Sequence, residues 1–156
     1  MNIDLALGLH VLGFLTARRG SPLTSETLAD SFGTNPVVVR RVLGKLKEAG
    51  LVLSRRGAGG GSVLARDASE ITLRDVYLAV AERPELLRRH PGEADGAAQV
   101  LAGYINRIYD EAEDALLARL QSVTIEQMDA EVRPEICAAL ARRGLDSAAP
   151  ASQRAS

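Results

Sequence analysis

The sequence predicts a mainly α-helical protein with one small β-hairpin and one long helix toward its C-terminal end. Three segments support this prediction. Residues 35–50 have the periodicity and end signals of a short amphipathic helix with a basic outer face. Residues 51–65 contain two short apolar runs around a Gly-rich centre, which is the pattern of a hairpin. Residues 96–122 carry an apolar stripe that is too long for a small domain to cover alone.

Composition favours a globular chain with one domain, or a small domain with a helical extension. The 156 residues are 46% hydrophobic, whereas 3% aromatic residues and the absence of Trp argue against base-stacking sites for single strands. The one cysteine, Cys137, cannot form an internal disulfide and suits a reducing cytoplasm. Asp4 and the shortness of the apolar run at 11–15 predict neither a signal peptide nor a membrane span.

The net charge of −1 conceals an asymmetry along the chain. Residues 1–66 contain nine Lys and Arg against four Asp and Glu, a net charge of +5. Residues 67–156 contain ten against sixteen, a net charge of −6. A basic front half and an acidic back half are expected when one end of a protein meets a polyanion.

Two helices are expected before the basic one. Residues 2–17 form an apolar helix, in which His10 is expected to be packed rather than to bind a metal. Thr24 is a good N-cap for a helix at 25–32. A short turn that contains Gly33 then leads into the next helix, and two short helices joined in this way match a helix-turn-helix.

The helix at 35–50 is the segment around which the chain is organised. Asn35 suits the N-cap, Pro36 suits the first helical position, and Gly50 suits a left-handed C-terminal cap. A helix that is buried on one face and basic on the other is a candidate for the DNA major groove, and an ordinary solvated face is the alternative. The inward stripe consists of Val39, Val42, Leu43 and Leu46. The outward face consists of Val37, Val38, Arg40, Arg41, Gly44, Lys45 and Lys47.

A strand at 51–54, a Gly-rich tip at 55–61 and a returning strand at 62–65 are expected next. A hairpin directly after a helix-turn-helix makes a winged helix. The bare backbone of the tip suits phosphate contacts, and Arg55 or Arg56 could enter the minor groove, where the potential is most negative. No Lys follows the glycines as in a nucleotide-binding P-loop, so that interpretation is disfavoured.

A helix at 71–82 with Thr72 as its cap and a linker at 83–95 with two prolines precede the long helix. A helix of about 25 residues is roughly 38 Å long at 1.5 Å per residue. Its stripe therefore needs a partner, and a second copy of the chain is the simplest one. Packing on its own domain is the alternative. The expected dimer interface consists of Leu101, Ile105, Ile108, Ala112, Leu116 and Leu120.

A short helix at 124–132 is expected to be interrupted by Pro134, and a further helix at 135–143 contains Cys137. The small polar residues of the last segment predict a disordered tail. The predicted organisation is a winged helix-turn-helix domain at 1–82, a linker at 83–95, a dimerisation helix and C-terminal helices at 96–143, and a tail at 144–156.

The succession of these segments resembles the Rrf-type family of bacterial winged-helix transcription regulators, which includes the IscR-, NsrR- and CymR-like repressors. The resemblance covers residues 1 to about 120. It is carried by Thr24 to Phe32, the run NPVVVRRVLGKLKEAGLVLSRRGAGGG from Asn35 to Gly61, the Leu64-Ala65-Arg66 that follows, and ITLRDVYLAV from Ile71 to Val80.

The resemblance implies a homodimer, crossed through the long helix, that binds a partly palindromic double-stranded DNA operator and acts as a repressor. By position, Val38, Arg40 and Arg41 match residues that face bases or phosphates in that family. Arg56 matches the wing arginine of the minor groove, and Ser62 replaces the usual aromatic at the wing base. The predicted DNA-binding residues are Thr34, Asn35, Val38, Arg40, Arg41, Lys45, Arg55, Arg56, Gly59 and Gly60.

The sensing chemistry is expected to differ from that of cluster-containing members. Those members carry three cysteines in the linker before the long helix, and the linker at 83–95 has none. Because an iron–sulfur cluster needs several thiolates or imidazoles, we expect no cluster, and we expect no other metal or cofactor. Redox sensing by Cys137 and a small-molecule effector between the long helix and the winged domain are alternative hypotheses for the signal.

Two other function classes stand beside a cytoplasmic DNA-binding regulator. A winged helix can be a protein–protein interaction module that does not bind DNA, although the positive charge of residues 1–66 counts against it. An enzyme is disfavoured because His10 and His90 have no evident nucleophile as partner and no metal-ligand spacing is present.

Overall fold

The computed structural model describes residues 3–18, 20–81 and 96–142, with side chains described as far as Glu135. Strands β1 (Val52–Arg55) and β2 (Gly61–Leu64) form an antiparallel hairpin, so the predicted mainly helical class with a small hairpin is confirmed. None of the helices in these ranges is long and apolar enough to cross a membrane. The helices are α1 (Ile3–Ala17), α2 (Ser25–Phe32), α3 (Pro36–Glu48), α4 (Leu73–Val80), α5 (Ala97–Gln121) and α6 (Ile125–Arg142), with a 3-10 turn at Ala68–Glu70.

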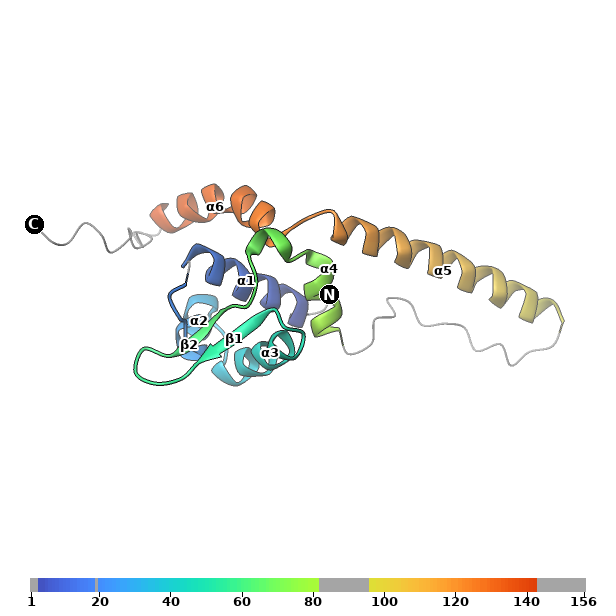
Figure 1. Cartoon of the computed structure of the whole chain (residues 1–156). Helices are drawn as coiled ribbons and strands as arrows, with labels where there is room; N and C mark the ends of the chain where they lie inside the picture. Colours follow the sequence, from blue (N-terminus) through green and yellow to red (C-terminus); the bar gives the residue numbers. More distant parts are fainter. Residues whose placement is uncertain (1–2, 19, 82–95, 143–156) are drawn as a thin grey trace, which may run out of the picture.

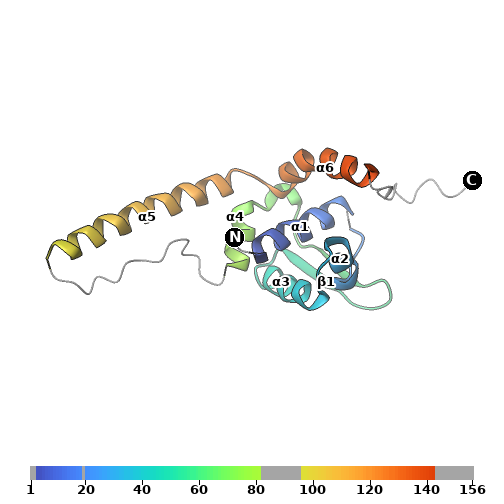
Figure 2. The ribbon, with the colours of Figure 1, turned by 180° about the vertical axis from the view of Figure 1, so that it is seen from behind.

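The hairpin and the first four helices form a compact body, from which α5 extends as a long arm (Figure 1). The chain then turns back so that α6 lies along α1, as the view from behind also shows (Figure 2). Two backbone hydrogen bonds clamp the α5–α6 junction to the start of α4. Leu73 N donates to Val123 O at 2.9 Å, and Ile125 N donates to Ile71 O at 2.8 Å. The C-terminal end of α5 is therefore fixed to the body.

A continuous apolar core joins α1, α2, α3, α4 and the start of α6. Val39, Val42 and Leu46 of α3 are completely buried and Leu43 is half-buried, which confirms the predicted inward stripe. Ile125, the first residue of α6, is also completely buried in this core. The last helix is thus anchored on the winged body at its first turn.

The helix-turn-helix is defined by local caps that the sequence predicts. Thr24 Oγ1 accepts from Thr27 N at 3.2 Å at the start of α2, and Asn35 Oδ1 accepts from Val37 N at 2.8 Å at the start of α3. These hydrogen bonds satisfy backbone N–H groups that have no partner within the first helical turn. Gly50, with φ of +68°, ends α3 in the left-handed conformation.

The base of the hairpin is bound to the segment that precedes α2. Leu23 N donates to Ser62 O at 3.0 Å, and Ser62 N donates to Leu23 O at 2.8 Å. Gly61 permits this approach, because a Cβ at its position would lie 2.7 Å from the carbonyl carbon of Leu23. Ser62 is itself buried, so this small residue fits the base of the wing without an aromatic ring.

A buried carboxylate fixes α3 against α1. Asp4, whose side chain is 8% exposed, accepts from Arg41 Nη2 at 2.6 Å and from Lys45 Nζ at 2.9 Å. Lys45 Nζ also donates to the carbonyl oxygen of Val80 at the end of α4, at 3.2 Å. The two cations thus connect three helices through charge-assisted hydrogen bonds, which are stronger than neutral ones.

The C-terminal helix differs from its prediction. We expected Pro134 to separate a helix at 124–132 from one at 135–143, but α6 continues through Pro134. A proline removes one hydrogen bond of a helix and its ring clashes with the preceding turn, which bends a helix more often than it ends one when the flanking turns are stable. The predicted helix at 71–82 is also shorter, since α4 ends at Val80.

The hairpin base provides a test of packing. Gly61→Ala should lower the free energy of unfolding by about 2 kcal/mol, because the new Cβ meets the Leu23 backbone and the residue has a φ of +152°. Gly44→Ala is the matched control: nothing lies within 4 Å of a Cβ there, so α3 should gain up to about 1 kcal/mol. Urea unfolding would measure both, and equal effects of the same sign would contradict this account.

The Asp4 ion pairs provide a second test. Asp4→Ala should cost about 2 kcal/mol of folding stability, because both cations lose a charge-assisted partner and one of them is largely buried. Asp30→Ala removes an exposed acid of α2 and should change stability by less than about 0.5 kcal/mol. Thermal unfolding at one fixed protein concentration is the measurement, and comparable losses for both variants would argue against the role of Asp4.

Candidate nucleic-acid interface

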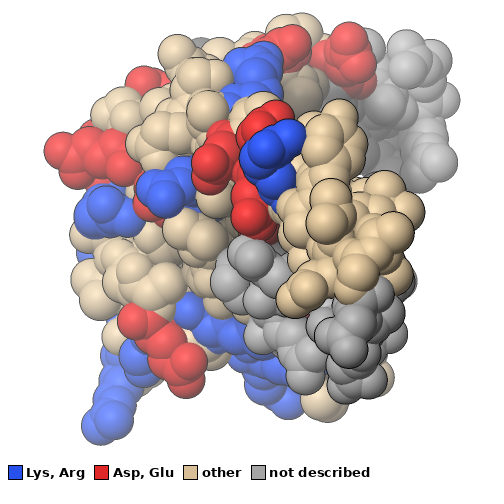
Figure 3. Space-filling model, turned by 90° about the vertical axis from the view of Figure 1, so that its right-hand side faces the viewer, with Lys and Arg blue, Asp and Glu red and all other residues tan. Residues whose placement is uncertain are grey.

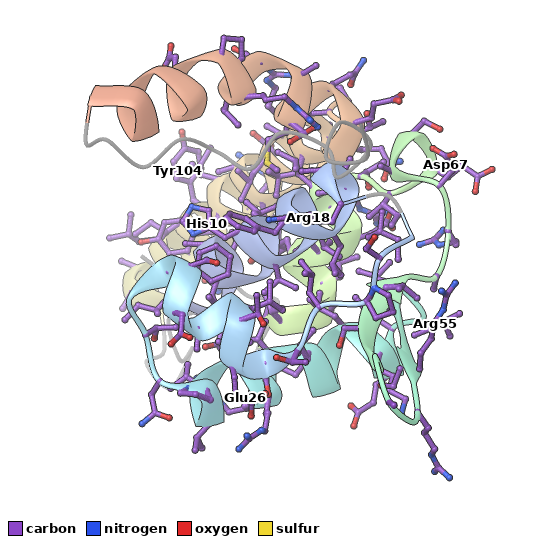
Figure 4. All side chains as sticks on the ribbon, turned by 90° about the vertical axis from the view of Figure 1, so that its left-hand side faces the viewer. His10, Arg18, Glu26, Arg55, Asp67 and Tyr104 are labelled. Carbon is purple, nitrogen blue, oxygen red and sulfur yellow. The ribbon has the colours of Figure 1, made fainter. Side chains whose placement is uncertain are left out.

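A groove of about 460 Å³ lies between the start of α2, the outer face of α3 and the hairpin. Apolar side chains of Leu23, Leu43 and Val52 contribute to its lining. Figure 4 shows Glu26 on α2 and Arg55 on the hairpin in the lower half of the molecule, well below Tyr104 of α5. The charged residues of the lining are Glu26, Arg40, Lys47 and Arg55.

Positive charge gathers on the same side of the body. Figure 3 shows Lys and Arg side chains along its lower part, where Figure 1 places α3 and the hairpin. Asp and Glu side chains are more numerous higher on the same face (Figure 3). This distribution follows the charge asymmetry of the sequence, and a basic side of this kind attracts polyanions.

The outer face of α3 is less basic than its sequence suggests. Arg40 forms an ion pair with Glu26 of α2, and two further cations of α3 bind Asp4 as described above. Within the described part of the chain, Lys47 is exposed and has no ion-pair partner. Three of the four cations of this helix therefore have a carboxylate partner in the protein itself.

The remaining predicted residues of this region differ in orientation. Asn35 uses its side-chain oxygen in the cap, while Thr34 and Val38 are half-buried. Lys45 is held against α1 with 22% of its side chain exposed. Val37 is 64% exposed, as its predicted place on the outward face implies, although it is not among the predicted DNA-binding residues.

The two arginines of the hairpin differ in their contacts with the rest of the chain. Arg55 Nη1 donates to the carbonyl oxygen of Gly20 at 3.2 Å and so connects the hairpin to the segment between α1 and α2, and both Arg55 and Arg56 are exposed. The tip depends on glycine. Gly59 has a φ of +75°, and a Cβ on Gly60 would lie 2.4 Å from the Arg55 carbonyl oxygen. The tip therefore presents backbone that carries almost no side chain.

A small hydrogen-bond network lies at the mouth of the groove. Arg40 Nη2 donates to Glu26 Oε1, Arg40 Nε donates to Ser25 Oγ at 3.1 Å, and Ser25 Oγ donates to Glu26 Oε2 at 3.1 Å. The hydrogen bond from the backbone N–H of Glu26, followed by those from the side chains of Arg40 and Ser25, holds the pKa of the Glu26 carboxyl below its ordinary value. Glu26 therefore remains a carboxylate at neutral pH.

The expected dimer residues of α5 divide into two groups. Leu101, Ile108 and Ala112 are exposed, whereas the other three are half-buried. Val100 and Tyr104 extend the exposed apolar face, with exposed fractions of 75% and 54%. The side chain of Cys137 lies outside the described residues, as do the linker at 83–95 and the tail at 144–156.

Comparison with known proteins relates this geometry to transcription regulators. YwnA of Bacillus subtilis, named provisionally as an HTH-type transcriptional regulator, is 32% identical over 130 residues, which is 82% of this chain and 96% of YwnA. IscR of Photorhabdus laumondii, named as an HTH-type transcriptional regulator, is 28% identical over 108 residues, 69% of this chain and 64% of IscR. The structure of CymR, the global cysteine regulator of B. subtilis, aligns with a TM-score of 0.68 and 22% identity over 84% of this chain and 96% of CymR.

The sequence profile of the Rrf2 family, described as iron-dependent transcriptional regulators, matches residues 1–131. The donor set of this chain does not fit an iron–sulfur cluster, because it has one Cys and two His. Within the described ranges no group of three or more Cys, His, Asp and Glu is arranged to hold a metal ion. The match extends over the helix-turn-helix, the hairpin and the long arm, and the chain belongs to the Rrf2 family of DNA-binding transcriptional regulators, not to a family of enzymes.

Proposed function

We propose that this protein is a homodimer that binds a partly palindromic, double-stranded DNA operator and represses transcription without an iron–sulfur cluster. It would act in the cytoplasm, where the bacterial chromosome lies. The observation that carries the proposal is the groove described above, because α3 and the Gly-rich hairpin border the same groove and face the same side. A helix and a narrow hairpin suit the major groove and the adjacent minor groove, respectively.

The exposed residues of α3 have complementary roles in this arrangement. Arg40 lies in the groove and supplies donors for base edges or phosphates. Val37, exposed at the start of the helix, offers an apolar contact for a thymine methyl group. Lys47 is suited to a phosphate, because an ammonium group acts as a point charge without a fixed hydrogen-bonding plane.

The hairpin would contact the flanking minor groove through Arg56. Arg55 Nη1 donates to the carbonyl oxygen of Gly20, while Arg56 is exposed beside the bare tip. The narrow minor groove concentrates negative potential, which favours an inserted arginine. The backbone around Gly59 and Gly60 can approach phosphates closely because no side chain intervenes.

The proposed homodimer forms through the exposed face of α5. Leu101, Tyr104 and Ile108 expose large apolar side chains along this arm, and a second copy of the same helix would cover them. A two-fold dimer presents two copies of α3 to two half-sites related by the same symmetry. The regulatory signal in this proposal is a small molecule or a redox change at Cys137.

One observation favours the competing function, a winged helix that binds a protein and not DNA. Carboxylates of the chain itself compensate three of the four cations of α3, which weakens the attraction of this helix for a polyanion. A gel shift with duplex DNA at increasing salt separates the two functions. Duplex binding that weakens steeply with salt supports the regulator, and the absence of such binding supports the interaction module.

Two substitutions should divide base recognition from phosphate binding. Arg40→Ala should weaken binding to a selected operator about tenfold or more while changing binding to unrelated duplex much less, because Arg40 contacts bases in this proposal. Lys47→Ala should weaken both by a similar factor and reduce the salt dependence by about one released counterion. Fluorescence anisotropy titrations at several salt concentrations measure both effects. Equal, sequence-independent losses from the two changes would refute the division.

Substitutions on α5 test the dimer. Leu101→Glu combined with Ile108→Glu should shift the protein to a monomer in sedimentation velocity at micromolar concentration, because two carboxylates would be buried at the interface. Operator binding should weaken at least tenfold as the second half-site contact is lost. Each single variant, Leu101→Glu or Ile108→Glu, should weaken the dimer, whereas Gln99→Glu adds the same single charge at an exposed position of the same helix and should remain dimeric. A wild-type monomer would overturn this part of the proposal.

A further inference from the structure

The carboxylate of Glu26 lies on the surface proposed to bind DNA, where a negative charge is unexpected. Glu26 lines the groove between α2, α3 and the hairpin, and its side chain is 56% exposed. A phosphate placed in this groove would be repelled by it. The exposed ion pair contributes little to folding, and a carboxylate in the first turn of α2 adds only a small stabilisation through the helix dipole at an exposed position.

The partners of Arg40 leave one edge of its guanidinium group available. The Nε–H and one N–H of Nη2 lie on the same side edge, and these donate to Ser25 and Glu26. The outer edge, formed by Nη1 and the second N–H of Nη2, has two parallel donors in a fixed plane. Neither Ser25 nor Glu26 accepts a hydrogen bond from Nη1.

A pair of parallel donors matches one base in the major groove better than the others. Guanine presents two acceptors there, O6 and N7, and a bidentate arginine contact to them is the commonest specific contact in protein–DNA complexes. A phosphate can accept from the same edge. The nearby Glu26 carboxylate repels a phosphate because both are negative, whereas the guanine edge carries no net charge.

We propose that Glu26, together with Ser25, is a positioning residue that holds the side edge of Arg40 so that its outer edge reads a guanine in the operator. This inference rests on the proposed DNA binding and adds the base that Arg40 selects. Glu26 touches neither base nor phosphate in this arrangement. It raises specificity in two ways: it fixes the plane of the guanidinium, and it makes sequence-independent phosphate binding by Arg40 less favourable.

The test begins with selection of duplexes from a random-sequence pool by the full chain. Binding of the wild type and the variants is then measured on the selected duplex, on an unrelated duplex, and on the selected duplex with each conserved guanine replaced in turn by 7-deazaguanine, which lacks the N7 acceptor. The variants are Glu26→Gln, Ser25→Ala and Arg40→Lys. Glu48→Gln is the charge-matched control, since Glu48 is an exposed acid at the end of α3.

The wild type should lose about tenfold in affinity at one 7-deazaguanine position, a typical share of one bidentate contact. Glu26→Gln should lower the ratio of selected to unrelated binding about tenfold, in part by tightening binding to unrelated duplex, and Ser25→Ala should lower it less. Glu48→Gln should tighten both affinities by similar factors and leave the ratio unchanged. In an Arg40→Lys background, Glu26→Gln should change the ratio less than twofold, because the fork that Glu26 positions is gone.

Three results would overturn the inference. Glu26→Gln could behave as Glu48→Gln does, which would reduce Glu26 to a general surface charge. The wild type could be indifferent to 7-deazaguanine at every position of a well-selected duplex, which would exclude guanine as the base that Arg40 reads. The wild type could enrich no duplex at all, and that result would remove the proposed function together with this inference, whereas the first two leave DNA binding intact.

Discussion

The direction of the basic side chains of α3 depends on how this helix packs on the core. Val39, Val42 and Leu46 are completely buried, and a helix with three such anchors on one stripe has one orientation about its own axis. The Asp4 ion pairs reinforce this orientation from the edge of the helix, because they join α3 to α1. The residues of α3 that line the groove, including Arg40 and Lys47, take their direction from this packing.

The electrostatic character of this surface depends more on which cations form ion pairs than on how many cations it has. A count of Lys and Arg treats the four cations of α3 as equivalent, but their contacts differ. Asp4 holds Arg41 and Lys45 against α1, and Glu26 orients Arg40. Lys47 remains exposed. Long-range attraction of DNA depends on the net field, which the two carboxylates reduce. Recognition of a particular base depends on the direction of donors, which the same carboxylates can improve. In the proposed complex, this pairing would favour selectivity over strong electrostatic binding.

Local signals in the sequence were sufficient for much of the fold. Thr24, Asn35 and Gly50 act within a few residues of their own positions, so helix starts and ends could be predicted from spacing alone. Pairings between distant segments could not, because nothing near Asp4 in the sequence indicates that it meets α3. The Arg55–Gly20 hydrogen bond could not be predicted for the same reason, and Arg55 remains in the lining of the groove. The packing of α6 along α1 is also tertiary, and the sequence alone did not predict that α6 continues through Pro134.

The clamp between the start of α4 and the α5–α6 junction makes α5 a rigid extension of the body and not a flexible linker. DNA-binding domains joined by a flexible linker accept a range of half-site separations, with an affinity that changes gradually with linker length. DNA-binding domains joined by a rigid helix accept only the half-site separation that the helix fixes. Each inserted base pair also rotates one half-site about the duplex axis by roughly 35°, since one turn contains 10–10.5 base pairs. In a dimer built on α5, the protein would therefore act as a ruler, and the distance between half-sites would decide which promoters it controls as strictly as their base sequence.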